Sequence, residues 1–192
     1  PRHLSSAASD VYKRQNAYGH GIHWTVNTAV DSGVVWFAVA TIDEAILVRS
    51  ISDNIRILLL SEPSISELEK LAIYDIDTTV YNQTFIEALG ESQHSFNVHL
   101  KIDTGMHRVG CSPDKFDRLY EKISSFSNLA LEGICTHFPV ADTDERQSNH
   151  SVKIFKETIS AVDIENLLIH ADNSASTTYN NEKIFNMTRN FS

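Results

Sequence analysis

VVWFAVATIDEAILV, residues 34–48, joins the pattern of a buried strand directly to the start of a helix. The seven apolar residues 34–40 are typical of a strand that is covered on both faces. Thr41 and Glu44 then stand at the capping-box spacing, and a helix pattern continues over residues 45–48. A buried strand followed at once by a helix is the repeating unit of an α/β fold.

The same unit recurs along the chain. Strand patterns cover residues 55–60, 78–81, 96–103, 129–136 and 167–170, and another begins over 185–189; helix patterns cover 64–74, 84–89, 113–126, 145–162 and 174–179. Repeated βα units make the strands parallel. One more strand before Asn16 makes eight, so we predict a (β/α)8 barrel. An open doubly wound sheet is the structural alternative, but the chain has no GxGxxG fingerprint to support it.

Composition narrows the range of partners. The 192 residues carry a formal net charge of −9, which argues against nucleic acid or an anionic membrane as the main partner. No apolar run approaches the roughly 20 residues of a membrane span. The two cysteines, Cys111 and Cys135, lack a metal-type spacing. We therefore expect a cytoplasmic protein with reduced thiols and no metal site.

Polar residues follow several of the predicted strands. Four such strand ends are KIDTGMHRVG (101–110), THFPVAD (136–142), HADNSAS (170–176) and Arg189. Active sites of (β/α)8 barrels lie at the carboxyl ends of the strands. Asn173 and Ser174 precede a helix pattern, where side chains and amides can bind a phosphate. Arg108 and Arg189 are suited to an anion or an aromatic heteroatom.

These motifs resemble those of the alanine racemases, enzymes of fold type III that depend on pyridoxal 5'-phosphate (PLP). NAYGHG (16–21) resembles the end of the family's lysine motif, and KIDTGMHRVG is similar to its second signature almost letter for letter. LEGICTHFPVAD (131–142), HADNSAS and FNMTR (185–189) are similar to the next three, in order. The resemblance covers residues 16–189 and implies a PLP-binding (β/α)8 barrel of the TIM type.

The resemblance also implies roles for residues at the centre of the site. Lys101 matches a lysine that is often carbamylated and then orients the following arginine. Arg108 matches that arginine, which reaches the cofactor's phenolic oxygen and the substrate carboxylate. His137 matches a histidine that lies against the cofactor ring. Arg108 and His137 are therefore the candidate catalytic residues of this chain.

Other matching residues are implied to hold the cofactor. Tyr18 matches a tyrosine near the phosphate, and Ser174 matches a phosphate ligand, with Asn173 beside it. Arg189 matches the arginine that donates a hydrogen bond to the pyridine nitrogen. A guanidinium only donates, so it leaves that nitrogen unprotonated. The ring is then a weaker electron sink, which suits racemisation.

The amino terminus departs from the family. The Schiff-base lysine of the family falls on Arg14, and arginine stays protonated and cannot form the imine. Lys13 is one residue out of register, and such a shift on a strand points a side chain to the opposite face. Residues 5–15 (SSAASDVYKRQ) can be encoded by a string that matches a transposase adapter used in sequencing libraries. We expect residues 1–15 to be non-native, with a diverged terminus as the alternative.

We therefore expect residues 16–192 to form part of an alanine racemase barrel domain, incomplete at its first strand and truncated before the family's C-terminal β domain. The implied activity of the parent is the interconversion of L- and D-alanine, which supplies D-alanine for peptidoglycan. In the family's homodimer, a tyrosine of the β domain acts at the partner's site. We expect this chain to be inactive.

Three alternatives stay open. A serine or broad-specificity racemase has the same fold type, and its specificity residues lie partly in the β domain. A single-domain PLP-binding homeostasis protein also consists of a barrel alone, although its motifs match less well. The third is a structural or binding fragment without a ligand.

Overall fold

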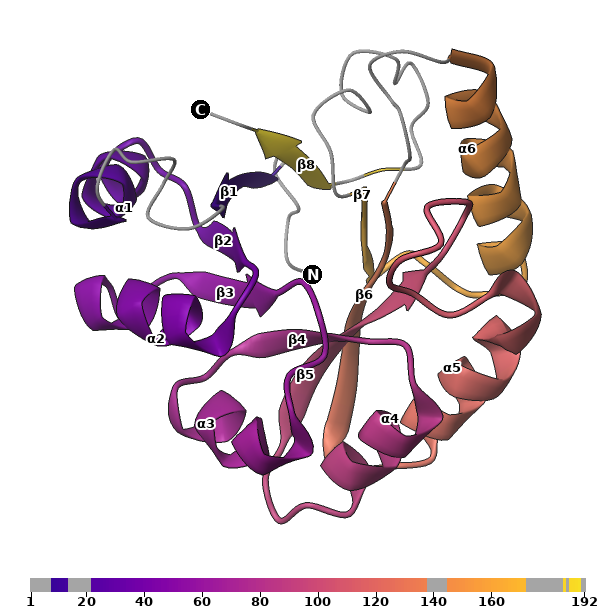
Figure 1. Ribbon diagram of the computed structural model, residues 1–192, viewed down its shortest axis with the longest axis horizontal. Coiled ribbons are helices and arrows are strands. Elements are labelled where there is room, and N and C mark those ends of the chain that lie inside the picture. The colour runs from indigo at the N-terminus through magenta and orange to yellow at the C-terminus, as the bar shows by residue number, and fades with distance from the viewer. Residues whose placement is uncertain (1–7, 14–21, 138–144, 172–184, 186, 191–192) are drawn as a thin grey trace.

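The structure is a parallel β-barrel enclosed by helices (Figure 1). The computed structural model describes residues 8–13, 22–137, 145–171, 185 and 187–190. Its strands are β1 (Ala8–Lys13), β2 (Trp36–Val39), β3 (Arg56–Leu59), β4 (Asp77–Val80), β5 (Phe96–Ile102), β6 (Leu129–Thr136), β7 (Leu168–Ala171) and β8 (Met187–Asn190). Each strand pairs in parallel with the next, and β1 pairs with β8. The predicted (β/α)8 barrel is confirmed.

Helices follow strands β1 to β6; the sequence predicted those after β2 to β6, but not the one after β1. They are α1 (Ile22–Asp31), α2 (Ile42–Ile51), α3 (Leu68–Ile73), α4 (Gln83–Gly90), α5 (Phe116–Ser124) and α6 (Glu145–Ile159), with 3₁₀ turns η2 (Ile65–Glu67) and η3 (Pro113–Lys115) before α3 and α5. Thr41 Oγ1 accepts a hydrogen bond from Glu44 N at 3.3 Å, and Ser64 and Glu67 form a complete capping box. The helix predicted over residues 174–179 lies outside the described residues.

The expectation for the first strand was wrong in one respect. We expected an ill-fitting strand that leaves the barrel open. Instead, β1 pairs over four positions with β2 and over four with β8, so the barrel is closed. Ladder hydrogen bonds use only backbone groups, which every residue of β1 supplies. Val11 and Tyr12 also favour an extended conformation.

Side chains alternate between two cores along β2 and β3. Phe37, Val39, Ile57 and Leu59 pack in the large cluster that also contains helix residues, so they face outward toward the helical layer. The residues between them, Trp36, Ala38, Leu58 and Leu60, form a separate cluster that contains no helix residue. This second cluster lies in the barrel interior. The alternation therefore fixes which strand positions can reach a site inside the barrel.

Candidate active site

The carboxyl ends of β5 and β6 bring three of the predicted site residues to one end of the barrel, which we call the mouth. Lys101 lies on β5, Arg108 in the loop that follows it, and His137 directly after β6. β5 and β6 are neighbours, with Ile102 in register with Thr136. Lys101 is buried, His137 half-buried and Arg108 exposed. These three residues therefore lie at the same end of the barrel.

Lys101 is a buried amine with a defined acceptor. Its side chain is among the largest that are fully buried, with 2% exposure for the residue. Nζ donates a hydrogen bond of 3.2 Å to the carbonyl oxygen of Leu60, the residue that follows β3. A buried ammonium is costly without such acceptors. The backbone at the end of β3 therefore helps to place the Lys101 amine.

Arg108 belongs to a loop whose two ends are joined. Asp103 N donates to Cys111 O and Cys111 N donates to Lys101 O, both at 2.8 Å. Gly110 has a φ of +128°, and a Cβ there would lie 2.7 Å from Asp103 N. Glycine is therefore required where the loop returns to β5. The joined ends confine the segment that carries Arg108 to the mouth.

Hydroxyl groups anchor the base of this loop. Thr136 Oγ1 donates to Ile102 O at 2.9 Å, and it lies 2.8 Å from Thr104 Oγ1, which therefore donates to it. Ser151 Oγ on α6 donates to Thr104 O at 2.8 Å. All three hydroxyl-bearing residues are buried. Thr136 directly precedes His137, and Thr104 lies at the start of the loop that carries Arg108. The same contacts therefore hold the backbone next to His137 and the backbone at the base of the Arg108 loop.

Glu62 and Tyr81 also lie near the mouth, where β3 and β4 end, and sequence reasoning missed them. Glu62 Oε1 accepts hydrogen bonds from Tyr81 N at 2.6 Å and Asn82 N at 2.7 Å. Burial raises the pKa of Glu62 to about 7, although these two hydrogen bonds lower it. An acidic residue two positions after a strand pattern was the signal available in the sequence.

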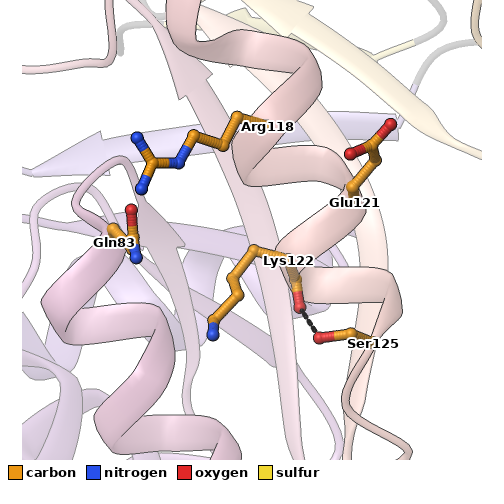
Figure 2. Close-up of a pocket in the computed structure, with 5 residues that line it drawn as sticks. All are labelled: Gln83, Arg118, Glu121, Lys122 and Ser125. Carbon is orange, nitrogen blue, oxygen red and sulfur yellow. Dashed lines mark hydrogen bonds between the residues drawn. The ribbon is translucent and has the colours of Figure 1, made fainter.

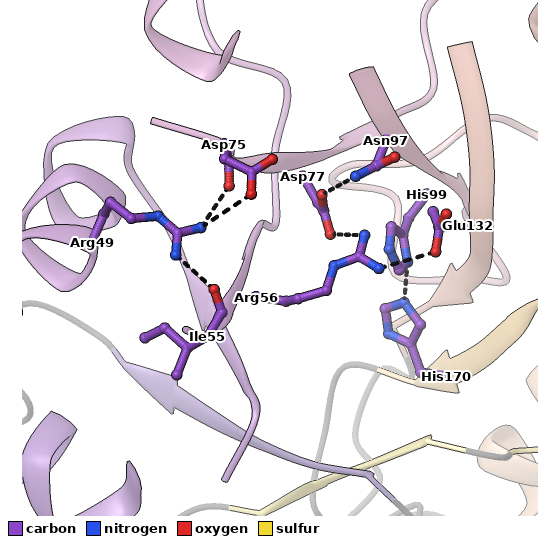
Figure 3. Close-up of polar contacts among 9 residues, drawn as sticks. All are labelled: Arg49, Ile55, Arg56, Asp75, Asp77, Asn97, His99, Glu132 and His170. Carbon is purple, nitrogen blue, oxygen red and sulfur yellow. Dashed lines mark hydrogen bonds and ion pairs between the residues drawn. The ribbon is translucent and has the colours of Figure 1, made fainter. Parts of the chain in front are cut away.

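The opposite end of the barrel, which we call the floor, holds an ion-pair cluster (Figure 3). Arg56 Nη2 lies 2.6 Å from Asp77 Oδ2, and Arg56 Nη1 lies 3.1 Å from Glu132 Oε2. Asn97 Nδ2 donates to Asp77 Oδ1 at 3.0 Å. The guanidinium also stacks over the Trp36 ring, 4.4 Å from its centroid. These side chains come from the first halves of their strands, so the cluster is separate from the mouth.

Burial and charge act in opposite directions on this cluster. Burial raises the pKa of Asp77 to about 6, although the Arg56 charge and the Asn97 amide lower it. Burial lowers the pKa of Arg56, but the charges of Asp77 and Glu132 outweigh it and raise the pKa overall. We infer that the guanidinium stays charged and that Asp77 is the group that titrates.

Two buried histidines lie beside this cluster. His99 Nδ1 is 2.9 Å from His170 Nε2, and the rings meet edge to face. The register of β5 and β6 shifts between Val98 and His99, and Gly133 then faces His99. A Cβ on Gly133 would lie 2.5 Å from His99 Nδ1. Glycine at position 133 therefore makes room for the imidazole.

Comparison with known proteins assigns this barrel to a family. The family model described as alanine racemase, N-terminal domain, matches residues 10–190. The chain belongs to this family. An alanine racemase of Treponema denticola is 38% identical over 187 residues, which cover 92% of this chain and 49% of that protein. Alanine racemase 1 of Bacillus subtilis (strain 168) is 33% identical over 180 residues, covering 92% and 46%.

Solved structures agree with the alanine racemase assignment. The alanine racemase of E. faecalis superposes with a TM-score of 0.87 at 31% identity, covering 97% of this chain and 52% of that one. The alanine racemase of Clostridium difficile 630 superposes with a TM-score of 0.88 at 25% identity, covering 96% and 50%. The chain thus spans about half the length of the alanine racemases it matches.

Several residues of the alanine racemase pattern cannot be placed. Arg14, Tyr18, Asn173 and Ser174 lie outside the described residues. The backbone of Arg189 lies on β8, in register with Asp10. Lys13 is in register with Val39, one of the outward-facing residues of β2, whereas Asp10 and Tyr12 are in register with the interior residues Trp36 and Ala38.

A groove on the outer layer of this alanine racemase domain carries no comparable chemistry (Figure 2). It lies between α4 and α5 and is lined by Gln83, Arg118, Glu121, Lys122 and Ser125. Lys122 Nζ is paired with Glu87 at 3.0 Å, outside the barrel.

Among the described residues, no group of three His, Cys, Asp or Glu side chains could hold a metal ion. Within the same residues, no helix has the length and apolar character that a membrane span needs.

Proposed function

We propose that the parent of this chain is a PLP-dependent racemase that interconverts L- and D-alanine in the cytoplasm and so supplies peptidoglycan synthesis. The observation that carries the proposal is the placement of Lys101, Arg108 and His137 at the carboxyl ends of two neighbouring strands in a barrel of the alanine racemase family. The relatives at 38% and 33% identity are named alanine racemases.

The described residues fit an anionic aromatic cofactor. A buried amine, an exposed guanidinium and a half-buried imidazole share the mouth, and the guanidinium is positively charged. Asn173, Ser174, Tyr18 and Arg189 would hold the phosphate and the ring nitrogen. When bound, PLP withdraws electrons from the substrate's α-carbon and makes its hydrogen acidic.

The residues of the mouth then act on substrate and proton position. Arg108 binds the substrate carboxylate, and the joined loop keeps it over the barrel. Lys101 orients Arg108. Carbamylation of its Nζ would turn a cation into an anion and so attract the guanidinium. His137 would lie beside the bound cofactor.

Inversion requires one acid–base group on each face of the α-carbon. The family supplies a lysine at position 14 and a tyrosine from the second domain of a homodimeric partner. This chain has Arg14 at the first position. We therefore propose that the 192-residue chain itself does not racemise alanine.

A racemase of another amino acid is the alternative for the parent. A histidine racemase of Leuconostoc mesenteroides has the same fold, with a TM-score of 0.85 at 22% identity. The barrel alone therefore does not select the amino acid.

The test is to recover the unbroken gene and assay its purified product with L-alanine, L-serine and L-histidine, measuring the D-enantiomer. Fastest turnover of alanine, with a β domain encoded downstream, supports the proposal. Preference for another amino acid contradicts it, and a stop codon soon after the barrel favours the PLP homeostasis protein.

A further inference from the structure

We propose that Glu62 is a positioning residue for Lys101. It fastens the segment after β3 to the start of α4, and so keeps the Leu60 carbonyl where the Lys101 amine donates to it. The claim that Glu62 places the Lys101 amine depends only on the contacts described below. Its importance for catalysis rests on the proposed function, in which Lys101 orients Arg108.

One carboxylate oxygen makes the connection. Glu62 Oε1 accepts from Tyr81 N at 2.6 Å and from Asn82 N at 2.7 Å. In return, Glu62 N donates to the Tyr81 hydroxyl at 3.4 Å. Asn82 is itself the N-cap of α4, and its Oδ1 accepts from Thr84 N at 2.9 Å. The segment after β3 is therefore bound to a fixed helix start.

The segment that Glu62 fastens is the one that meets Lys101. Leu60 lies two residues before Glu62, and its carbonyl accepts the Lys101 hydrogen bond at 3.2 Å. On its other side, Leu60 N donates to Val39 O at 2.9 Å, and Ser61 Oγ donates to Ala40 O at 3.3 Å. β2 thus holds one side of this segment. Glu62 supplies the corresponding contact on the side of β4.

The contact of Glu62 with the Tyr81 and Asn82 amides needs an acceptor oxygen on a side chain as long as glutamate, more than it needs a negative charge. Burial raises the pKa of Glu62 to about 7, so the carboxyl is present in both forms near neutral pH. Both forms retain an oxygen that accepts from backbone N–H groups. Glutamine offers the same oxygen at the same reach. Aspartate keeps the charge but is one methylene shorter, and leucine has similar bulk without an acceptor.

The experiment follows Lys101 directly by NMR in the 192-residue chain labelled with [13Cε]lysine, without PLP or alanine. Lys101→Met assigns the signal. The variants are Glu62→Gln, Glu62→Asp and Glu62→Leu. Glu67→Leu is the matched control, because Glu67 Oε2 also accepts from a backbone amide, Ser64 N at 3.2 Å, but does not contact Tyr81 or Asn82. Circular dichroism checks folding of each variant.

We expect the Lys101 signal to keep its position in Glu62→Gln and Glu67→Leu, and to move and broaden in Glu62→Asp and Glu62→Leu. If Glu62→Leu does not fold, the Asp and Gln variants still decide between reach and charge. An unmoved signal in Glu62→Asp overturns the proposal, and so does a signal that moves in Glu62→Gln. Failure of the parent to racemise alanine affects neither result, so the two proposals are tested separately.

Discussion

Asp77 and Arg56 form an ion pair of 2.6 Å at the floor of the barrel, with the carboxylate side chain 4% exposed and the guanidinium side chain 33% exposed. Glu132 binds the other guanidinium nitrogen, and Asn97 binds the other carboxylate oxygen. The pair therefore joins the first residues of β3 and β4 to β5 and β6. The contribution of this ion pair to the free energy of unfolding can be measured in the 192-residue chain.

Arg56→Met should lower the free energy of unfolding by about 3 kcal/mol, because it leaves the Asp77 carboxylate buried without its counter-charge. Adding Asp77→Asn should recover part of that loss. Urea unfolding of the two single variants and the double variant gives the coupling energy.

The matched control is the pair Arg49 and Asp75, whose side chains lie 3.9 Å apart with the carboxylate 88% exposed. Arg49 also donates to the carbonyls of Ile55, Tyr74 and Asp75, which Asp75→Asn leaves in place. Its coupling with Asp75 should be within about 0.5 kcal/mol of zero. Equal coupling in the two pairs would contradict the special position of Asp77.

Asp77 should also make stability depend on pH. Its pKa in the fold is about 6, above that of an unfolded aspartate at about 3.9. The favourable contribution of the protonated form is therefore complete below about pH 4 and is lost as the pH rises through about 6. Relative to Asp77→Asn, the chain should lose about 2 kcal/mol between about pH 4 and 7. Parallel pH profiles for the two proteins would be the opposite result.

Gly133→Ala should destabilise the barrel by about 2 to 3 kcal/mol, because the new methyl would overlap His99 Nδ1 and the carbonyl of Leu168, 2.6 Å away. Gly33→Ala is the comparison. Gly33 has a φ of +85°, and no atom lies within 4 Å of the place that a methyl group would take, so only backbone strain of about 1 kcal/mol is expected. Thermal unfolding of both variants, followed by circular dichroism, separates the two causes; a larger loss at Gly33 would refute the steric explanation.

The 192-residue chain should not bind PLP covalently. Position 14 is arginine, and Lys13 is in register with the outward-facing Val39. Borohydride treatment after incubation with PLP should leave no pyridoxyl adduct on Lys13 by mass spectrometry. Arg14→Lys should create such an adduct at position 14 if the first strand presents this position to the barrel interior. It should not create racemisation, since the proposed reaction needs a second acid–base group on the opposite face of the α-carbon.

The sequence predicted the barrel well, because a barrel of this kind depends on local patterns. Strand and helix periods repeat along the chain, and polar motifs stand at the strand ends. The floor could not be predicted in the same way. Arg56 interrupts the apolar run IRILLL, and its partners Asp77 and Glu132 are 21 and 76 residues away. Only the register of four strands brings them together.

The closure of the first strand was mispredicted for a related reason. The pairing of β1 with β2 and β8 depends on backbone groups, which the composition of residues 1–15 does not report. Glu62 was missed because its partners, two backbone amides after β4, leave no mark in the sequence.

The pairing of β1 with β8 also bears on the order in which the molecule assembles. These strands, Ala8–Lys13 and Met187–Asn190, stand at opposite ends of the described chain, so their contact closes a loop that contains nearly every other residue. Such a contact is entropically expensive and slow to form. A nascent chain on the ribosome can pair β1 with β2 early, but it cannot complete the ring before β8 has left the exit tunnel. Until then, β1 and the last strand to have formed each present an unpaired edge to other nascent chains, and these two edges are open to aggregation during synthesis.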